Sequence, residues 1–179
     1  SDGSPLLVLN NGLEIDCSLI VFCKGVRPNT DMFSGLIPQG GGLKVDWHMR
    51  TLFPDVFAAG DVAETYEITR HEYCLAATWP HAVQQGRLAG MNMAGHVAAY
   101  GGSLFRNAME IFGLPFVSMG IIRVPSRENW DVRIMHRDKC YRKLVYRDGN
   151  LVGALLVGNV AEAGLLQAEI RRAASENFY

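Results

Sequence analysis

A carboxylate directly after a glycine is the first feature of this sequence that could do chemistry. The apolar residues Val56–Ala59 lead into Gly60 and Asp61, and they predict a strand that ends at a short acidic side chain. Ligands bind at the carboxyl ends of strands in α/β folds, and an ionised carboxylate accepts hydrogen bonds from hydroxyl or amide donors. Asp61 is therefore a candidate for holding a ligand hydroxyl. The dipeptide alone fits equally well an aspartate that caps a helix or turn.

The second candidate site is the start of the clearest helix in the sequence, near Trp79. Thr78 is a plausible cap and Pro80 suits a first helical turn. Apolar and small residues recur at helical spacing and predict one packed face, where two glycines would allow close approach to a sheet or another helix: Ala82, Val83, Gly86, Ala89, Gly90, Met93 and Val97. The free N–H groups and positive dipole end of such a start stabilise negative charge on a ligand. We expect the His81 imidazole at the surface or in a cap, without a catalytic role.

Two strand signals precede these sites. Leu6–Leu9 and Leu13–Ile15 flank an Asn-Asn-Gly turn and predict a hairpin. Ser18–Cys23 is a continuous apolar run, which is typical of a strand buried on both faces. It ends at Gly25 and Arg27, which taken alone predict a surface loop. After a glycine-rich connector at 40–42, residues 43–46 predict a further short strand.

The last third of the sequence predicts an antiparallel sheet and a helix. Asp131–Arg137 alternates as a half-buried strand does, and the segments Tyr141–Tyr146 and Leu151–Val157 flank an Arg-Asp-Gly-Asn hairpin signal. The helix, Ala161–Ala174, has an apolar face made by Ala163, Leu166, Ile170 and Ala174. The basic residues of these strands predict either a solvated sheet face or a surface for an acidic redox partner: Arg133, Arg137, Arg142, Lys143 and Arg147.

Composition places the 179-residue chain among ordinary globular proteins, with 49% hydrophobic and 20% charged residues. A net charge of −1 gives no long-range attraction for nucleic acid or an anionic membrane. No apolar run approaches the roughly 20 residues that span a bilayer. Four cysteines without a CxxC pair predict reduced thiols and a cytoplasmic location. His71 and Cys74 lack the two further ligands of a structural zinc site, so no metal is expected.

The sequence resembles the pyridine-nucleotide-disulfide oxidoreductases, flavoproteins that take hydride from NAD(P)H. Residues 50–61, which read RTLFPDVFAAGD, are similar to the second flavin-binding motif of that family, and residues 79–86 are similar to the helix that follows it. Residues 25–30, which read GVRPNT, are similar to the exit loop of the NAD(P)H-binding domain. The resemblance implies FAD as cofactor and NAD(P)H as co-substrate. It implies cofactor-binding roles for Gly25, Arg27, Ala59, Gly60, Asp61, Trp79, Pro80, His81 and Ala82.

In this family the aspartate corresponding to Asp61 accepts a hydrogen bond from a ribityl hydroxyl of FAD. The helix start faces the pyrimidine edge of the flavin, where His81 and Ala82 would supply backbone N–H groups and Trp79 would shape the pocket. The resemblance assigns no catalytic residue. Cys23 and Lys24 stand where the family more often has small residues, and Ser18 stands where it tends to have an aspartate.

Residues 113–115 and 148–154 resemble the C-terminal interface domain of the NADH oxidase, rubredoxin reductase and nitrite reductase branch. His136 is followed by arginine, and the absence of a His-Pro pair separates the sequence from the glutathione reductase branch. The resemblance implies a homodimer through this domain and a small redox protein as a possible electron acceptor. It implies an α/β plus α+β fold: the tail of an NAD(P)-binding domain (1–45), the end of an FAD-binding domain (46–100) and an α+β interface domain with an antiparallel sheet (101–179).

A glycine-rich phosphate loop of the form G-x-G-x-x-G is missing from the sequence. We therefore expect a C-terminal fragment of a flavoprotein that passes hydride from NAD(P)H to FAD and electrons to an acceptor. The chain alone is expected to be inactive and to bind FAD weakly or not at all. The alternative is a non-catalytic dimerisation or interaction module.

Overall fold

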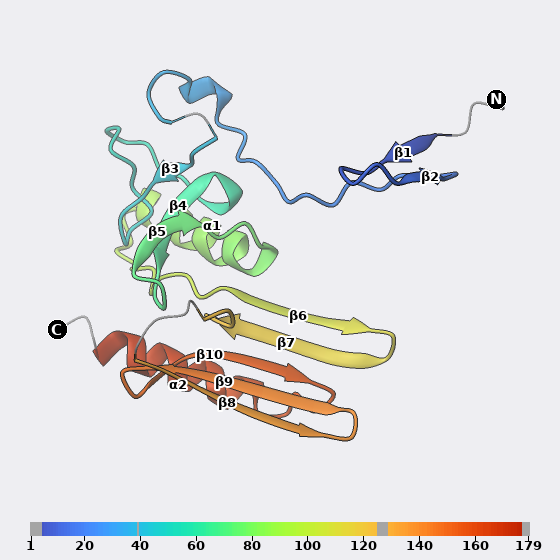
Figure 1. Cartoon of the computed structure of the whole chain (residues 1–179). Helices are drawn as coiled ribbons and strands as arrows, with labels where there is room; N and C mark the ends of the chain where they lie inside the picture. The colour runs from blue at the N-terminus through green and yellow to red at the C-terminus, as the bar shows by residue number, and fades with distance from the viewer. Residues whose placement is uncertain (1–4, 39, 125–128, 177–179) are drawn as a thin grey trace.

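Three sheets and two α-helices make up the described part of the chain, residues 5–38, 40–124 and 129–176 of a computed structural model (Figure 1). This mixed architecture confirms the predicted fold class. The first and third expected domains each include some residues outside these ranges. No helix of the described residues is long and apolar enough to cross a membrane.

The chain begins with the predicted hairpin, in which β1 (Leu6–Val8) pairs antiparallel with β2 (Glu14–Asp16). Figure 1 shows this hairpin standing apart from the remainder of the chain, to which an extended segment joins it. A 3₁₀ helix, η1 (Asp31–Phe33), follows.

The predicted buried strand at Ser18–Cys23 is wrong. The segment has no strand assignment, and Leu19 and Phe22 are 77% and 78% exposed. A continuous apolar run becomes a buried strand only where neighbouring strands pair with it and other elements cover both faces. Within the described residues no strand lies beside this segment to do so.

The second sheet has the order β3-β4-β5, with β3 (Leu43–Lys44) parallel to β4 (Ala63–Glu67) and β5 (Glu72–Leu75) antiparallel to it. β3 lies within the short strand predicted at 43–46. β4 and β5 were not predicted, because β4 turns Thr65 and Glu67 inward as well as Ala63. Buried polar residues of this kind hide the alternation on which strand prediction depends.

Helix α1 (Trp79–Met93) forms where predicted, with Pro80 in its first turn. Thr78 occupies the cap position but its side chain makes no capping hydrogen bond. The predicted packed face is wrong, because Val83 and Met93 are 52% and 67% exposed. The residues that α1 buries are instead mostly polar: His81, Gln85, Ala89 and Asn92.

The third sheet contains five antiparallel strands in the order β6-β7-β10-β9-β8. The three predicted strands are confirmed as β8 (Trp130–Arg137), β9 (Cys140–Arg147) and β10 (Asn150–Val157). The predicted hairpin is confirmed by positive φ angles of 51° at Asp148 and 81° at Gly149. β6 (Arg106–Ile111) and β7 (Leu114–Gly120) were not predicted.

Helix α2 (Ala163–Glu176) covers one face of this sheet, and its predicted apolar face is confirmed. Leu166, Ile170 and Ala174 are buried in one cluster with the sheet residues Met119, Leu144, Ala154 and Leu156. Directly paired residues of antiparallel strands lie on the same face. The register therefore places a second set of side chains on the face away from α2, and we call this set the outer face: Met109, Ile111, Phe116, Val132, Ile134, Tyr141 and Leu155.

The predicted basic strand face does not form as one surface. Arg142 and Lys143 are neighbours in β9, so their side chains point to opposite faces of the sheet. On the α2 side, Arg142 is paired with Glu162, and Arg133 donates to Asp131 at 2.8 Å. On the outer face, Lys143 Nζ donates to the carbonyl oxygen of Ile122.

Candidate functional site

The segment that leads into the candidate carboxylate is not the predicted strand. Val56–Ala59 forms a single bridge, between Phe57 and Arg50, and the Ala58 N–H donates to Met49 O at 3.1 Å. Thr51 closes the intervening loop, since its Oγ1 donates to Val56 O at 2.9 Å. As at residues 18–23, the apolar run has no ladder partner among the described strands.

The chain turns sharply at Gly60, between an extended Ala59 and the 3₁₀ helix η2 (Gly60–Val62). Gly60 has a φ of 80°, which strains any residue with a side chain, and an added Cβ would lie 3.5 Å from the Ala82 Cβ. Asp61 follows in the first turn of η2 and is exposed. The turn thus presents a carboxylate to solvent while its backbone lies against α1.

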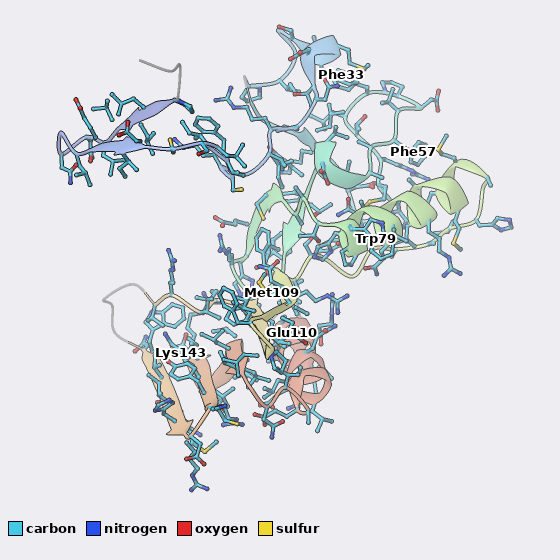
Figure 2. The ribbon with its side chains drawn as sticks, turned by 90° about the vertical axis from the view of Figure 1, so that its right-hand side faces the viewer. Phe33, Phe57, Trp79, Met109, Glu110 and Lys143 are labelled. Atoms are coloured by element: carbon cyan, nitrogen blue, oxygen red, sulfur yellow. The ribbon has the colours of Figure 1, made fainter. Side chains whose placement is uncertain are left out.

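The start of α1 is the other half of the site. The Gly60 N–H donates to Gln85 Oε1 at 2.8 Å, and Gly60 lies beside Ala82, so two segments predicted to bind one ligand meet. Trp79 is 80% exposed at the N-terminal end of α1, where Figure 2 labels it, and Pro80 is exposed beside it. Ala82 was expected to supply a free backbone N–H group at the helix start. Its N–H instead donates to Thr78 O at 3.0 Å and closes the first helical turn.

His81 is 4% exposed, so the expectation of a surface or capping imidazole is wrong. Its Nδ1 lies 2.9 Å from the Tyr100 hydroxyl and its Nε2 lies 3.0 Å from Leu104 O. Burial lowers the pKa of His81, although the hydrogen bond to the Leu104 backbone partly opposes this. A neutral imidazole therefore packs behind the helix start.

Gln85 and Tyr100 complete this buried cluster, and sequence reasoning did not find either residue. Gln85 Nε2 lies 3.4 Å from the Tyr100 hydroxyl, which lies 2.9 Å from Ser103 Oγ. The available signal was the four-residue spacing from His81 to Gln85, which places both side chains on one face of α1. The helical periodicity of apolar residues does not show this polar pair.

Gly25 and Arg27 are not part of this cluster. They lie on the exposed segment between β2 and η1, and Gly25 has a φ of 85°. The structure therefore brings together the flavin-motif and helix residues, and leaves the two residues predicted for the NAD(P)H side elsewhere.

His71 and Cys74 show no sign of joint chemistry. The His71 Nδ1 lies 3.1 Å from the Tyr66 hydroxyl, and burial, followed by the nearby Glu67 and Glu72, raises the pKa of Cys74 to about 11. A thiol with that pKa is a poor nucleophile and metal ligand at neutral pH. Within the described residues no three His, Cys, Asp or Glu side chains gather as a metal site.

Comparison with known families divides the chain in two. Residues 1–86 match the family model described as pyridine nucleotide-disulphide oxidoreductase. Residues 106–174 match the model described as the rubredoxin NAD+ reductase C-terminal domain. The first match contains Gly60, Asp61 and the start of α1, and the second contains β6–β10 and most of α2.

Curated relatives agree with these matches. A pyridine nucleotide-disulfide oxidoreductase domain-containing protein 1 from Drosophila melanogaster is 35% identical over 159 residues, which are 82% of this chain and 33% of that protein. An NADH oxidase from Enterococcus faecalis is 30% identical over 131 residues, which are 71% of this chain and 29% of the oxidase. The chain thus spans about a third of the length of these relatives.

Solved structures share the fold. A NAD-dependent persulfide reductase from A. fulgidus superposes with a TM-score of 0.84 and 24% identity, over 96% of this chain and 36% of that one. An NADH:rubredoxin oxidoreductase from Clostridium acetobutylicum gives a TM-score of 0.60 and 25% identity, over 85% and 37% of the two chains. The two family matches and the curated relatives show that the chain belongs to the pyridine nucleotide-disulfide oxidoreductase family.

Proposed function

We propose that residues 59–61 and the start of α1 form part of the FAD site of an NAD(P)H-dependent flavoprotein oxidoreductase. The observation that carries this proposal is the docking of Gly60 on α1, with the Gly60 N–H on Gln85 and its Cα facing Ala82. A Cβ at residue 60 would lie in van der Waals contact with Ala82, and the φ of 80° favours glycine. The turn therefore lies directly against the start of α1, the segment proposed to share the ligand with it.

Each residue of the site has a role that its chemistry supports. The exposed Asp61 carboxylate would accept a hydrogen bond from a ribityl hydroxyl. The positive end of the α1 dipole and the His81 N–H would stabilise negative charge at the pyrimidine edge, and the exposed Trp79 ring would be covered. Bound FAD would accept hydride from NAD(P)H and pass electrons to an acceptor. Gly25 and Arg27 would serve the NAD(P)H side.

The isolated chain would hold FAD weakly and would not oxidise NAD(P)H, because it spans about a third of its relatives. We propose that residues 46–100 supply the FAD contacts and that the whole protein works in the cytoplasm. The test is a fluorescence titration of the chain with FAD, combined with an assay for NADH and NADPH oxidation. Asp61→Ala should weaken binding about tenfold or more, as expected for a lost charge-assisted hydrogen bond.

Asp16→Ala is the matched control, since Asp16 is an exposed acid in β2 and its loss makes the same change in net charge. It should leave the FAD affinity unchanged. Equal affinities of Asp61→Ala and the unmodified chain would refute the assignment of Asp61. Stoichiometric FAD retained through gel filtration would refute the proposal that the chain binds it weakly.

A second function, dimerisation through the C-terminal domain (residues 101–179), is favoured by the outer face of its sheet. α2 covers the other face, whereas Met109, Ile111 and Ile134 on the outer face are 48%, 47% and 58% exposed. Apolar residues gathered on one sheet face are typical of protein interfaces. We propose that two copies of the chain pair through this face, and that a small redox protein accepts electrons from the dimer. That acceptor is suggested by the rubredoxin NAD+ reductase C-terminal domain match.

Light scattering after gel filtration tests the dimer. The unmodified chain should have the mass of two copies, and Ile134→Lys should have the mass of one, because a buried unpaired ammonium is costly. Leu165→Lys is the control, since Leu165 is 76% exposed on α2. A monomeric unmodified chain, or an Ile134→Lys variant that stays dimeric, would contradict the proposal.

A further inference from the structure

A chain of buried polar side chains runs from the Gly60 turn to the beginning of β6. Its five members are each between 0% and 4% exposed: Thr65, His81, Gln85, Tyr100 and Ser103. The hydrogen bonds between them measure 2.6 to 3.4 Å. Because buried polar groups need partners, the directions of these bonds can be worked out from the two backbone groups at the ends.

The first end is the Leu104 carbonyl, which can only accept a hydrogen bond. His81 Nε2 therefore carries the proton, and in the neutral imidazole Nδ1 is then an acceptor. The Tyr100 hydroxyl must donate its one proton to Nδ1, at 2.9 Å.

The second end is the Gly60 N–H, which can only donate. It fixes Gln85 Oε1 as the acceptor, so the Gln85 Nε2 amide points toward Tyr100 and donates to its hydroxyl oxygen. Since the Tyr100 hydroxyl donates its only proton to His81 Nδ1, Ser103 Oγ must donate to Tyr100 and Thr65 Oγ1 must donate to Ser103. The hydroxyl and imidazole protons of the network then each have one position.

We propose that Gln85 is the positioning residue of the flavin-binding turn, and that Tyr100 and His81 tie its orientation to the start of the C-terminal sheet at Leu104. The terminal torsion of a glutamine is soft, so an acceptor for Nε2 helps to hold Oε1 on Gly60. Tyr100 is that acceptor, and its hydroxyl is in turn held by His81. Asp61, the next residue after Gly60, takes its direction from this contact.

The inference deepens the proposed function and rests on it for the statement that the turn binds flavin. The hydrogen-bond claim can be tested on its own in the flavin-free chain, through amide hydrogen exchange of Gly60 followed by NMR. Exchange at Leu156, a buried residue of β10, reports on the stability of the fold in the same sample.

Four variants separate the parts of the claim. Gln85→Leu removes the acceptor and should speed Gly60 exchange about tenfold relative to Leu156, the effect of losing one hydrogen bond. Gln85→Glu keeps an acceptor oxygen and should retain the protection. Tyr100→Phe leaves Oε1 in place but frees the amide, and should give a smaller increase. Gln84→Leu changes the exposed neighbour and should have no effect.

Unchanged Gly60 exchange in Gln85→Leu, with Leu156 still protected, would overturn the positioning role. No change in Tyr100→Phe would overturn the link to Leu104. If Gln85→Leu loses exchange protection at Leu156 as well as at Gly60, the variant has lost its fold and Gln85→Glu becomes the test. An unprotected Gly60 in a folded Gln85→Glu variant would contradict the proposal. A chain that fails to bind FAD but shows the expected Gly60 pattern would refute the proposed function and leave this inference standing.

Discussion

At Gly60 the backbone, rather than a side chain, makes the contacts that shape the candidate site. Its φ of 80° favours glycine, its N–H donates to Gln85 Oε1, and it lies beside Ala82. The Gly60–Asp61 pair could be singled out from the sequence because the motif around it is specific. Tyr100 and the burial of His81 could not, because buried polar networks leave no apolar periodicity to follow, and for Gln85 the only signal was its polar spacing from His81.

The buried imidazole predicts a pH dependence of stability. The pKa of His81 is lowered in the folded chain by burial, so below the ordinary value near 6.5 the unfolded chain binds more protons. The contribution of neutral His81 to stability should therefore be complete above about pH 6.5. The free energy of unfolding should fall as the pH drops from there toward the lowered pKa of His81. The slope would be at most about 1.4 kcal/mol per pH unit.

Urea unfolding at about pH 7.5 and about pH 5 measures this dependence. His81→Gln replaces the ring with an amide that does not titrate and should reduce the loss at low pH. His71→Gln is the comparison, because burial also lowers the pKa of His71 but its side chain is exposed. The same loss at low pH in His81→Gln and the unmodified chain would contradict the assignment.

At the scale of elements, prediction succeeded where a segment finds its partners nearby in the sequence. β8, β9, β10 and α2 follow one another and pack together, so local alternation and helical spacing were sufficient. Ser18–Cys23 and Val56–Ala59 failed for the opposite reason, since each apolar run lacks a strand partner among the described residues. β6 was missed because all six of its residues are exposed.

The packing of α2 on its sheet predicts a large effect of one core substitution. Ile170 is 1% exposed among Leu144, Ala154 and Leu156, so Ile170→Ala should lower the free energy of unfolding by about 2–5 kcal/mol. Leu165→Ala, on the solvent side of the same helix, should change it by about 0.5 kcal/mol or less. Equal effects of the two substitutions, measured by urea unfolding, would mean that α2 does not cover this face.

At the scale of the whole molecule, apolar side chains are exposed at three places. They are the segment at 18–26, the face of α1 with Val83 and Met93, and the outer face of the C-terminal sheet. Figure 1 shows β3–β5 with α1 as one group and β6–β10 with α2 as another. The buried polar chain from Gly60 to Leu104 joins these two groups.

The central claim is that the Gly60 turn and the start of α1 bind one flavin together. The most direct measurement is an NMR titration of the labelled chain with FAD, read at backbone amides. We expect shifts at Ala59–Asp61 and in the first turn of α1, with both groups following one binding curve, and a loss of both in Asp61→Ala. Shifts confined to one group, two different curves, or no shifts at either group would contradict it.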